Sequence, residues 1–292
     1  MKYTFIKNHE YLFPIEKMCK VLQVSTSGYY KWKSKPISNR ILTKNEIKQK
    51  VTTIYFTSKQ RYGSPRITIE LNALGYKISR ITVAKYMKEL GLRSKLSKKF
   101  KVTTDSKHNY LVVENILDRD FAVDQPSKVW VSDITCIQTK EGLLYLTTII
   151  DLYDRKMIGW SLSNGMSTEE TSLAAWKMAI RNRGVQKGLI FHSDRGIQYA
   201  NKKFANTIES YGVIRSMSRK GNCWDNAVAE SFFTSLKTEL IYGNKLITKQ
   251  QMQLEIFEYI EIWYNKKRRH SALNYKTIEE FNNQNNIYKN VA

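Results

Sequence analysis

Three consecutive strand-like runs after Pro126 constrain the fold of this chain more than any other feature of its sequence. They are rich in Val, Ile, Leu, Thr and aromatic side chains and cover residues 129–137, 143–150 and 157–161. Because the segments that join these runs are short, we expect neighbouring runs to pair antiparallel, as a meander. A helical pattern from Thr168 to Arg181 then leads to a fourth apolar run, Leu189–Phe191, which should pair parallel after such a crossover.

Helical and strand patterns alternate in the rest of this half. Helices are expected at 204–211, 226–240 and 250–266, with a short strand at 213–214. Three meandering strands, a crossover helix, a parallel strand and flanking helices predict an α/β fold of ribonuclease-H-like architecture, with a mixed sheet.

The N-terminal third has a different pattern, of short helices. Residues 12–33 have the spacing of a small helix-turn-helix, and a simple helical hairpin that supports its neighbours is an equal alternative. A second helical unit starts near Thr43, and its last two helices should cover 66–74 and 80–90, with Ser79 as an N-cap. The predicted domains are a helix-turn-helix-like segment at 1–38, a helical DNA-binding domain at 39–100, a basic and polar linker at 101–125, a catalytic core at 126–283 and a polar tail at 284–292.

The positive charge of the chain is concentrated in this helical third. The net charge is +22, and residues 1–110 carry 24 Lys and Arg against 6 Asp and Glu, whereas the remaining 182 residues carry 24 against 20. This asymmetry favours a polyanion partner, nucleic acid above all, over a surface kept basic for solubility. A solvated charged face remains the alternative for the helix at 80–90, which has the pattern of a DNA-recognition helix. The candidate DNA contacts in this region are Arg66, Arg80, Lys85, Lys88, Arg93, Lys98 and Lys99.

Cysteine usage and hydropathy exclude two classes of protein. Cys19, Cys136 and Cys223 lie far apart, which argues against a zinc cluster or a disulfide framework. The longest apolar stretch, Leu143–Ile150, is too short to span a bilayer. We therefore expect a soluble protein of the cytoplasm.

Three acidic residues lie on different predicted elements of the α/β half. Asp133 is in the first strand, Asp194 follows the parallel strand and Glu230 lies one turn into an amphipathic helix. Two divalent ions can activate an attacking hydroxyl and stabilise a leaving oxygen in phosphodiester chemistry, and Mg²⁺ prefers carboxylate ligands. A lone Asp after a strand is usually a turn residue and a lone Glu on a helix is usually solvated, so the prediction depends on the three together. Asp151 and Asp154 are rival acids in a turn, and Asp225 is interpreted as a helix N-cap.

Five motifs of this chain match those of one protein family. They are Trp130–Thr135, Asp151–Arg155, His192–Tyr199, Asp225–Phe233 and Tyr264–Leu273. With these motifs the chain resembles the transposases of bacterial insertion sequences, as the second-frame product of the two-frame group, which share the catalytic core of retroviral integrases. The 60 residues between Asp133 and Asp194 and the 35 between Asp194 and Glu230 match the acid triad of that family. The resemblance covers essentially the whole chain.

This resemblance implies a DNA transposase that cleaves and transfers strands of a mobile element. It implies that Asp133, Asp194 and Glu230 are catalytic and hold two Mg²⁺ ions, for which Mn²⁺ should substitute. It also implies that Lys237 binds the terminal DNA of the element, that the partners are the element ends and the target DNA, and that the chain forms a multimer on DNA. In this family the first-frame product, often fused by frameshifting, supplies a further helix-turn-helix and a coiled coil, so that product is an expected partner.

The residues around the triad support several secondary predictions. Lys237 lies nearly two helical turns after Glu230 and therefore on the same helix face, within reach of a phosphate, although a plain surface lysine has the same pattern. His192 has the pattern of a histidine that packs beside the site, and the alternatives are that it orients the site or contacts DNA. Arg268 and His270 are expected to contact DNA, and Trp224 to stack on a base or, equally, to lie in the core. Two functions from other classes stay open: a DNA-binding regulator without activity of its own, and a ribonuclease-H-like nuclease that only hydrolyses.

Overall fold

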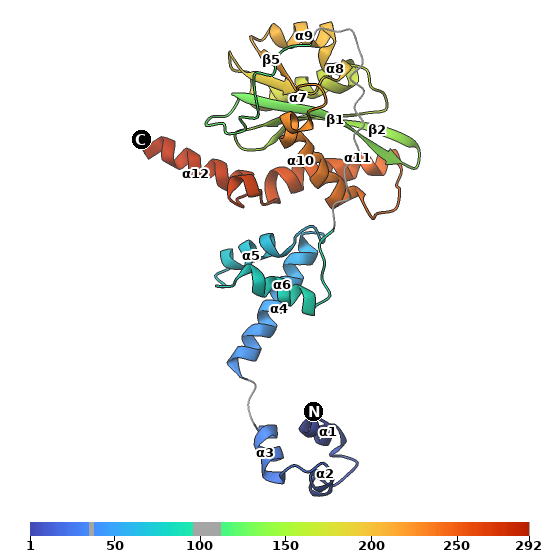
Figure 1. Ribbon diagram of the computed structural model, residues 1–292, viewed down its shortest axis with the longest axis vertical. Coiled ribbons are helices and arrows are strands. Elements are labelled where there is room, and N and C mark those ends of the chain that lie inside the picture. Colours follow the sequence, from blue (N-terminus) through green and yellow to red (C-terminus); the bar gives the residue numbers. More distant parts are fainter. Residues whose placement is uncertain (35–37, 96–111, 292) are drawn as a thin grey trace. The chain divides into compact units, whose positions relative to one another are not determined.

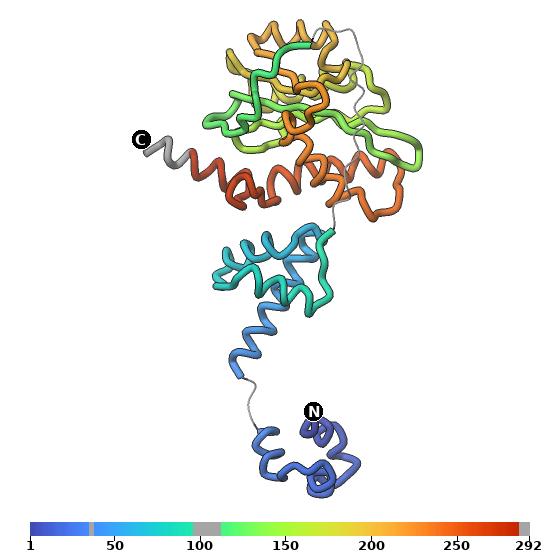
Figure 2. The backbone as a smooth tube through the Cα atoms, in the orientation of Figure 1, coloured from blue at the N-terminus to red at the C-terminus, as the bar shows by residue number. Residues whose placement is uncertain are grey.

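The chain forms two compact units, Met1–Arg93 and Ser94–Ala292, which are described separately. The computed structural model describes residues 1–34, 38–95 and 112–291, with side chains described as far as Asn285. Figure 1 labels the elements, and Figure 2 follows the backbone through both units. Residues 101–111 of the predicted linker at 101–125 lie outside the described residues.

Three short helices open the first unit. They are α1 (Lys2–His9), α2 (Ile15–Val21) and α3 (Thr26–Ser34). Met18, Cys19 and Tyr29 from α2 and α3 form a small core together with Ile6 of α1, a helix that the sequence pattern did not predict. The Ser25 hydroxyl accepts a hydrogen bond of 2.9 Å from the backbone N–H of Gly28, which satisfies an amide at the start of α3.

Three further helices follow in the same unit. They are α4 (Asn39–Thr57), α5 (Ser64–Ala73) and α6 (Arg80–Glu89). Their buried face is aliphatic and aromatic and includes Val51, Tyr55, Ile67, Leu71, Val83 and Met87. Ser79 caps α6 as predicted, since its hydroxyl accepts a hydrogen bond of 3.2 Å from the Thr82 amide. The helix pattern therefore located α5 and α6 to within two residues.

The second unit is built on a five-stranded mixed sheet in the order β3-β2-β1-β4-β5. Its strands are β1 (Val129–Thr139), β2 (Gly142–Asp151), β3 (Met157–Ser163), β4 (Ile190–Ser193) and β5 (Ile214–Met217). The first three pair antiparallel and β4 pairs parallel with β1, as the lengths of the connections predicted. The structure adds a parallel pairing between β4 and β5, for which the sequence pattern indicated only a short strand without a partner. The α/β expectation is therefore correct.

Helices cover both faces of this sheet (Figure 1). On one face lie α7 (Ala174–Arg183), which a π-helical turn η1 (Glu169–Leu173) precedes, α8 (Ile197–Ala200) and α9 (Lys202–Glu209). Their apolar side chains join those of the sheet around Trp130 and Trp176, which are both fully buried. Gly159 of β3 allows α7 to approach closely, because a Cβ atom there would lie 2.4 Å from the Ala175 carbonyl oxygen.

The opposite face carries the C-terminal helices. The short 3-10 helix η2 (Cys223–Asn226) leads into α10 (Ala227–Leu236), which continues as the π-helical η3 (Lys237–Ile241). Then come α11 (Lys249–Phe257), the π-helical η4 (Glu258–Lys267), the short η5 (Ser271–Leu273) and α12 (Ile278–Val291). The segment expected as a polar tail at 284–292 thus continues α12 as far as Val291. No helix within the described ranges has the length and apolar character needed to cross a membrane.

Candidate active site

Asp133 lies where β1 loses one of its two neighbouring strands. The parallel pairing between β1 and β4 ends at Val131 and His192, whereas β1 continues beside β2, so that Asp133 is opposite Thr148. The backbone N–H of Ile134 donates a hydrogen bond of 2.8 Å to the Asp133 carboxylate. Strand order in open α/β sheets commonly places ligands at such a point, beyond the carboxyl ends of parallel strands.

Asp194 follows the last residue of β4 directly, at that same end of the sheet. Its Oδ1 accepts a hydrogen bond of 2.9 Å from the Gly196 N–H. A Cβ atom at position 196 would lie only 2.9 Å from the same oxygen, so a glycine is needed for this approach. The turn therefore fixes the direction of the Asp194 carboxylate.

Glu230 is carried by the first turn of α10, and a buried amide ties the start of that helix to β1. The Asn226 side-chain N–H donates a hydrogen bond of 2.9 Å to the carbonyl oxygen of Ser132, the residue before Asp133. Ala229, Phe232, Phe233 and Leu236 form the buried face of α10. This packing leaves Glu230 on the partly exposed face, near the acid of β1.

The three carboxylates interact electrostatically. Burial raises the pKa of Asp133 well above its ordinary value, and the negative charges of Asp194 and Glu230 raise it further. The pKa of Glu230 is raised by burial and then by Asp194. The positive charge of Lys237 acts on Asp133 in the opposite direction and lowers its pKa. Like charges that disfavour one another's ionised form are typical of a site that a cation completes.

The chemistry of the donor set fits a hard divalent cation, since all three candidate ligands are carboxylates. Within the ranges that the structure describes, however, no three His, Cys, Asp or Glu side chains converge closely enough to hold an ion together. The acids are therefore near enough to affect one another's protonation and are not assembled as a finished coordination shell.

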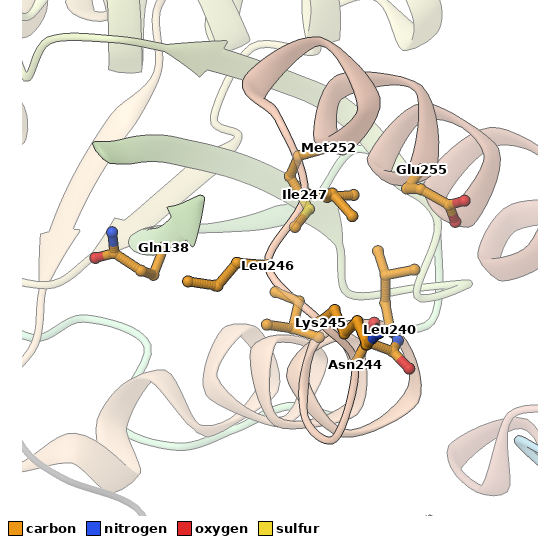
Figure 3. A pocket seen from close by; sticks show the side chains of 9 residues that line it. Gln138, Leu240, Asn244, Lys245, Leu246, Ile247, Met252 and Glu255 are labelled. Atoms are coloured by element: carbon orange, nitrogen blue, oxygen red, sulfur yellow. Dashed lines mark hydrogen bonds between the residues drawn. The ribbon is translucent and has the colours of Figure 1, made fainter. Parts of the chain in front are cut away.

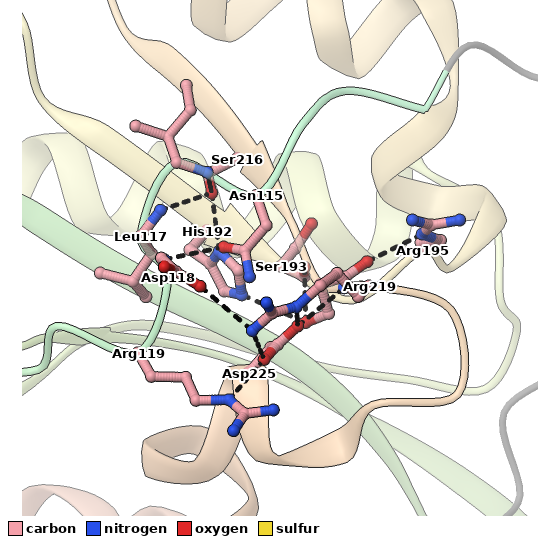
Figure 4. A network of polar contacts seen from close by, with 12 residues as sticks. Asn115, Leu117, Asp118, Arg119, His192, Ser193, Arg195, Ser216, Arg219 and Asp225 are labelled. Carbon is pink, nitrogen blue, oxygen red and sulfur yellow. Dashed lines mark hydrogen bonds and ion pairs between the residues drawn. The ribbon is translucent and has the colours of Figure 1, made fainter.

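A polar network surrounds Ser193 and Arg195, the residues on either side of Asp194 in the sequence (Figure 4). The His192 ring, fully buried, is 2.9 Å from the Ser216 hydroxyl through Nδ1 and 3.1 Å from the Ser218 hydroxyl through Nε2. Burial lowers the pKa of His192 to about 4, so its ring is neutral at physiological pH. Arg195 donates from Nε to the Ser218 carbonyl oxygen at 2.8 Å. His192 therefore packs beside the site, as predicted, and orders the segments around Asp194.

A second part of that network is centred on the Asp225 carboxylate, which accepts hydrogen bonds from two arginines. We call Arg119, Arg219 and Asp225 the Asp225 cluster. The Asp225 carboxylate is fully buried and accepts hydrogen bonds of 2.8–2.9 Å from the Arg219 amide, from both guanidinium nitrogens Nε and Nη2 of Arg219, and from Arg119. These bonds hold the pKa of Asp225 well below its ordinary value. Our interpretation of Asp225 as a helix N-cap was wrong, because its charge is neutralised by two arginines and no side chain caps α10.

The rival acids Asp151 and Asp154 are paired with other side chains inside the fold. Both are fully buried, and Arg183 bridges them with distances of 2.9 Å to Asp151 and 2.7 Å to Asp154. Asn282 also donates to Asp154, at 2.9 Å. These contacts use the carboxylates within the fold, away from the end of β4.

Two predicted DNA contacts are contradicted by their positions. The Arg268 guanidinium is buried and pairs with Glu239 at 2.8 Å, and His270 is buried with Nε2 3.0 Å from the Tyr264 carbonyl oxygen. Both side chains are therefore committed to the interior and cannot meet a phosphate on the surface.

The remaining candidates for DNA contact are on the surface or partly exposed. Lys237 is partly exposed, and in the first unit Arg80, Lys85, Lys88 and Arg93 are exposed. The Arg66 guanidinium lies 5.6 Å from the centre of the Tyr62 ring. Lys98 and Lys99 lie outside the described residues. Trp224 is 68% exposed, which excludes the alternative that it belongs to the core.

Sequence reasoning missed two residues that organise this site. Asn226 connects the start of α10 to β1 through its hydrogen bond to Ser132. The Tyr199 hydroxyl lies 2.7 Å from the Ser132 hydroxyl. Burial, together with the charges of Asp133 and Asp194, raises the pKa of Tyr199. Asn226 belongs to the Asp225–Phe233 motif, so the motif itself was the available signal. The signal for Tyr199 was only its place one helix after Asp194.

A separate cavity of about 270 Å³ lies between η3, α11 and the end of β1 (Figure 3). Its lining is mostly aliphatic, with Leu240, Leu246, Ile247 and Met252. None of the three acids lines it. It is therefore distinct from the candidate active site.

Comparison with known proteins is consistent with these two units. The family model "integrase core domain" matches residues 123–223, a second model of that description matches 211–277, and the model "HTH-like domain" matches 43–100. The transposase InsF for insertion sequence IS3A of Escherichia coli (strain K12) is 42% identical over 289 residues, which cover 98% of this chain and 99% of that protein.

Two further similarities were found. An uncharacterized 31 kDa protein of insertion element IS600 from Shigella sonnei is 40% identical over 256 residues, which cover 88% of this chain and 94% of that protein. Among solved structures, the HTLV-2 integrase catalytic core domain in complex with magnesium is similar with a TM-score of 0.40 at 17% identity, and the match covers 53% of this chain and 96% of that one.

Proposed function

The chain belongs to the insertion-sequence transposases with an integrase core domain, and from this premise we propose that Asp133, Asp194 and Glu230 are its catalytic, metal-binding acids. The protein cleaves DNA strands and transfers them, so that a mobile element moves by recombination. The observation that carries the residue assignment is the mutual electrostatic effect of these carboxylates at the point where β1 and β4 part.

We propose that two Mg²⁺ ions, or Mn²⁺ in their place, complete the site. Bound there, such ions would activate an attacking hydroxyl and stabilise the leaving oxygen of the phosphodiester. Asp133 and Asp194 would hold them from positions fixed by the sheet and by the Gly196 turn. Glu230, on the partly exposed face of α10, would complete the set when cation and DNA are bound, which agrees with the unfinished arrangement of the three acids.

Lys237 would bind the DNA that enters this site. It follows Glu230 by nearly two helical turns, and its charge lowers the pKa of Asp133, so it faces the acids. A lysine there attracts a phosphate without supplying a proton acceptor. We therefore assign Lys237 to the terminal phosphates of the element.

The first unit would supply most of the sequence-independent affinity for DNA. Exposed Arg80, Lys85 and Lys88 on α6 are suited to phosphate contacts. We propose that residues 39–100 form the DNA-binding domain, that 101–125 link it to the catalytic core at 126–283, and that the first-frame product of the element joins the chain in a multimer on DNA.

The decisive experiment is strand cleavage and joining on duplexes that carry the ends of the element, with Mg²⁺ or Mn²⁺. The chain is assayed alone and fused to its upstream frame, with Glu230→Gln as the test and Glu255→Gln, an exposed glutamate of α11, as the matched control. We expect Glu230→Gln to abolish both reactions while DNA binding persists, and the control to be active.

Each of the other possible results points to a different function or site. Activity that survives Glu230→Gln would overturn the triad assignment. Cleavage without joining would identify a nuclease that only hydrolyses, and binding without cleavage in every form would identify a regulator.

A further inference from the structure

An indole ring is exposed immediately before the candidate active site. Trp224 lies in η2, the 3-10 helix that runs into α10, and 68% of its surface is exposed. By contrast, Trp130 and Trp176 in the same unit are fully buried. Because the ring of Trp224 buries so little, packing within the fold gives no reason for a tryptophan at this position.

The backbone that carries this ring is held on its C-terminal side by two buried residues. Asp225, the next residue, accepts hydrogen bonds from Arg119 and Arg219 in the Asp225 cluster (Figure 4). Asn226 then donates to the Ser132 carbonyl oxygen. An exposed aromatic residue on a fixed backbone loses little conformational freedom when it binds a ligand.

These same contacts place the ring beside the chemistry. Asn226 connects η2 to the residue before Asp133, and Glu230 is in the first turn of the helix that η2 begins. The preceding residue Lys220 is exposed and cationic, which adds attraction for a phosphate backbone. An exposed aromatic face close in the chain to a cationic side chain is suited to binding unpaired nucleotides.

We propose that Trp224 stacks on an unpaired base at the DNA end where the strand is cut, and so stabilises the opened end against its paired form. The inference rests on the proposed function, because it concerns the same DNA substrate. Where the base pair at the cut opens, its bases lose stacking, and the ring compensates part of that loss.

The first test is photocrosslinking and does not need catalysis. The full chain is bound, with Ca²⁺ in place of Mg²⁺, to an element-end duplex with 5-iodouracil at the nucleotide next to the cleavage position, and is then irradiated. We expect a crosslink in the peptide that contains Trp224, and its loss in Trp224→Ala. A crosslink that maps elsewhere, or that persists in Trp224→Ala, would overturn the proposal.

The second test measures single-turnover cleavage on a paired duplex and on one whose base pairs at the cut are mismatched. Trp224→Ala should be slower on the paired duplex by about 5- to 100-fold, the range that base–aromatic stacking supplies. The mismatched duplex should restore most of that rate, and Trp224→Phe should retain most of it on both. Phe257→Ala, which removes another exposed aromatic ring (51% exposed), is the matched control and should equal wild type.

The outcomes separate this proposal from the proposed function. The stacking role alone would be overturned if wild type cleaves and Trp224→Ala cleaves at the same rate. It would also be overturned if Trp224→Ala is slowed by the same factor on the paired and the mismatched duplex. Wild type that cleaves neither duplex would overturn the function, and the crosslink would still decide whether Trp224 meets the base. Normal DNA cleavage combined with loss of a protein–protein contact in Trp224→Ala would identify a partner protein as its ligand and overturn the proposal.

Discussion

Glu239→Ala should destabilise the second unit strongly, because the Glu239 carboxylate is the counter-charge of the buried Arg268 guanidinium. Glu239 Oε1 accepts hydrogen bonds from the Arg268 guanidinium at 2.8 and 3.1 Å, and Oε2 accepts from the Tyr259 hydroxyl and the Trp263 indole at 3.0 Å each. Both side chains of the ion pair are 7% exposed. Burial alone would lower the pKa of Arg268, but the Glu239 carboxylate, together with Tyr259 and Tyr264, raises it above its ordinary value.

The magnitude follows from the charge that Glu239→Ala leaves behind. Removal of one partner of a buried ion pair costs about 3–5 kcal/mol, because the other charge stays desolvated. For a unit of this size that cost lowers Tm by roughly 6–20 °C. Differential scanning calorimetry of the full chain, in which the unfolding of the second unit is followed, measures the shift.

Two further variants control this measurement. Lys203→Ala removes the exposed pair with Glu169 and should leave Tm unchanged. The double variant Glu239→Ala with Arg268→Met removes both charges and should recover most of the stability that the single variant loses. A Tm for Glu239→Ala within about 2 °C of wild type, below the smallest shift that a 1 kcal/mol loss produces, would refute the reasoning.

Three other predictions concern the site. In the metal-free protein the raised pKa of Asp133 means that the folded state binds the Asp133 proton more tightly than the unfolded state, so stability falls as pH rises above the ordinary Asp range. Asp133→Asn should therefore have a higher Tm than wild type at pH 7. This difference in Tm should vanish below about pH 4, where Asp133 is protonated in both states. Burial lowers the pKa of His192 to about 4, so the neutral ring is favoured in the folded state. The contribution of His192 to the free energy of unfolding should therefore fall by up to about 3 kcal/mol as pH falls from 7 to 4, as measured by urea denaturation at each pH. Asn226→Ala should slow cleavage by about tenfold or more while DNA affinity in a gel-shift assay stays constant, since it releases α10 from Ser132; an unchanged rate would contradict this.

The sheet could be predicted because local patterns determine it. Runs of β-branched and aromatic residues joined by short turns defined β1–β3, and the crossover through α7 defined the parallel direction of β4. Helix ends are also determined by neighbouring residues in the sequence, as the cap that the Ser79 hydroxyl provides for α6 shows. The family motifs then singled out the three acids, which composition and periodicity alone could not have distinguished from turn and surface residues.

The errors concern charged residues whose partners are distant in the sequence. Arg268 looks like a surface cation until Glu239 is seen beside it, and Asp225 looks like a helix cap until Arg119, far earlier in the chain, is seen to donate to its carboxylate. A charged side chain can be buried only when a counter-charge meets it in the fold. No periodicity within one element contains that information.

The three candidate acids are separated along the chain as well as among elements, and this has a genetic consequence. Asp133 is encoded first, then Asp194, and Glu230 only after the sheet is complete. A copy of the gene that is interrupted before α10 still encodes the helical first unit and all five strands, yet lacks one of the three carboxylates. If the first unit binds DNA as proposed, such a decayed copy would encode a chain that can occupy the same DNA without the complete set of acids.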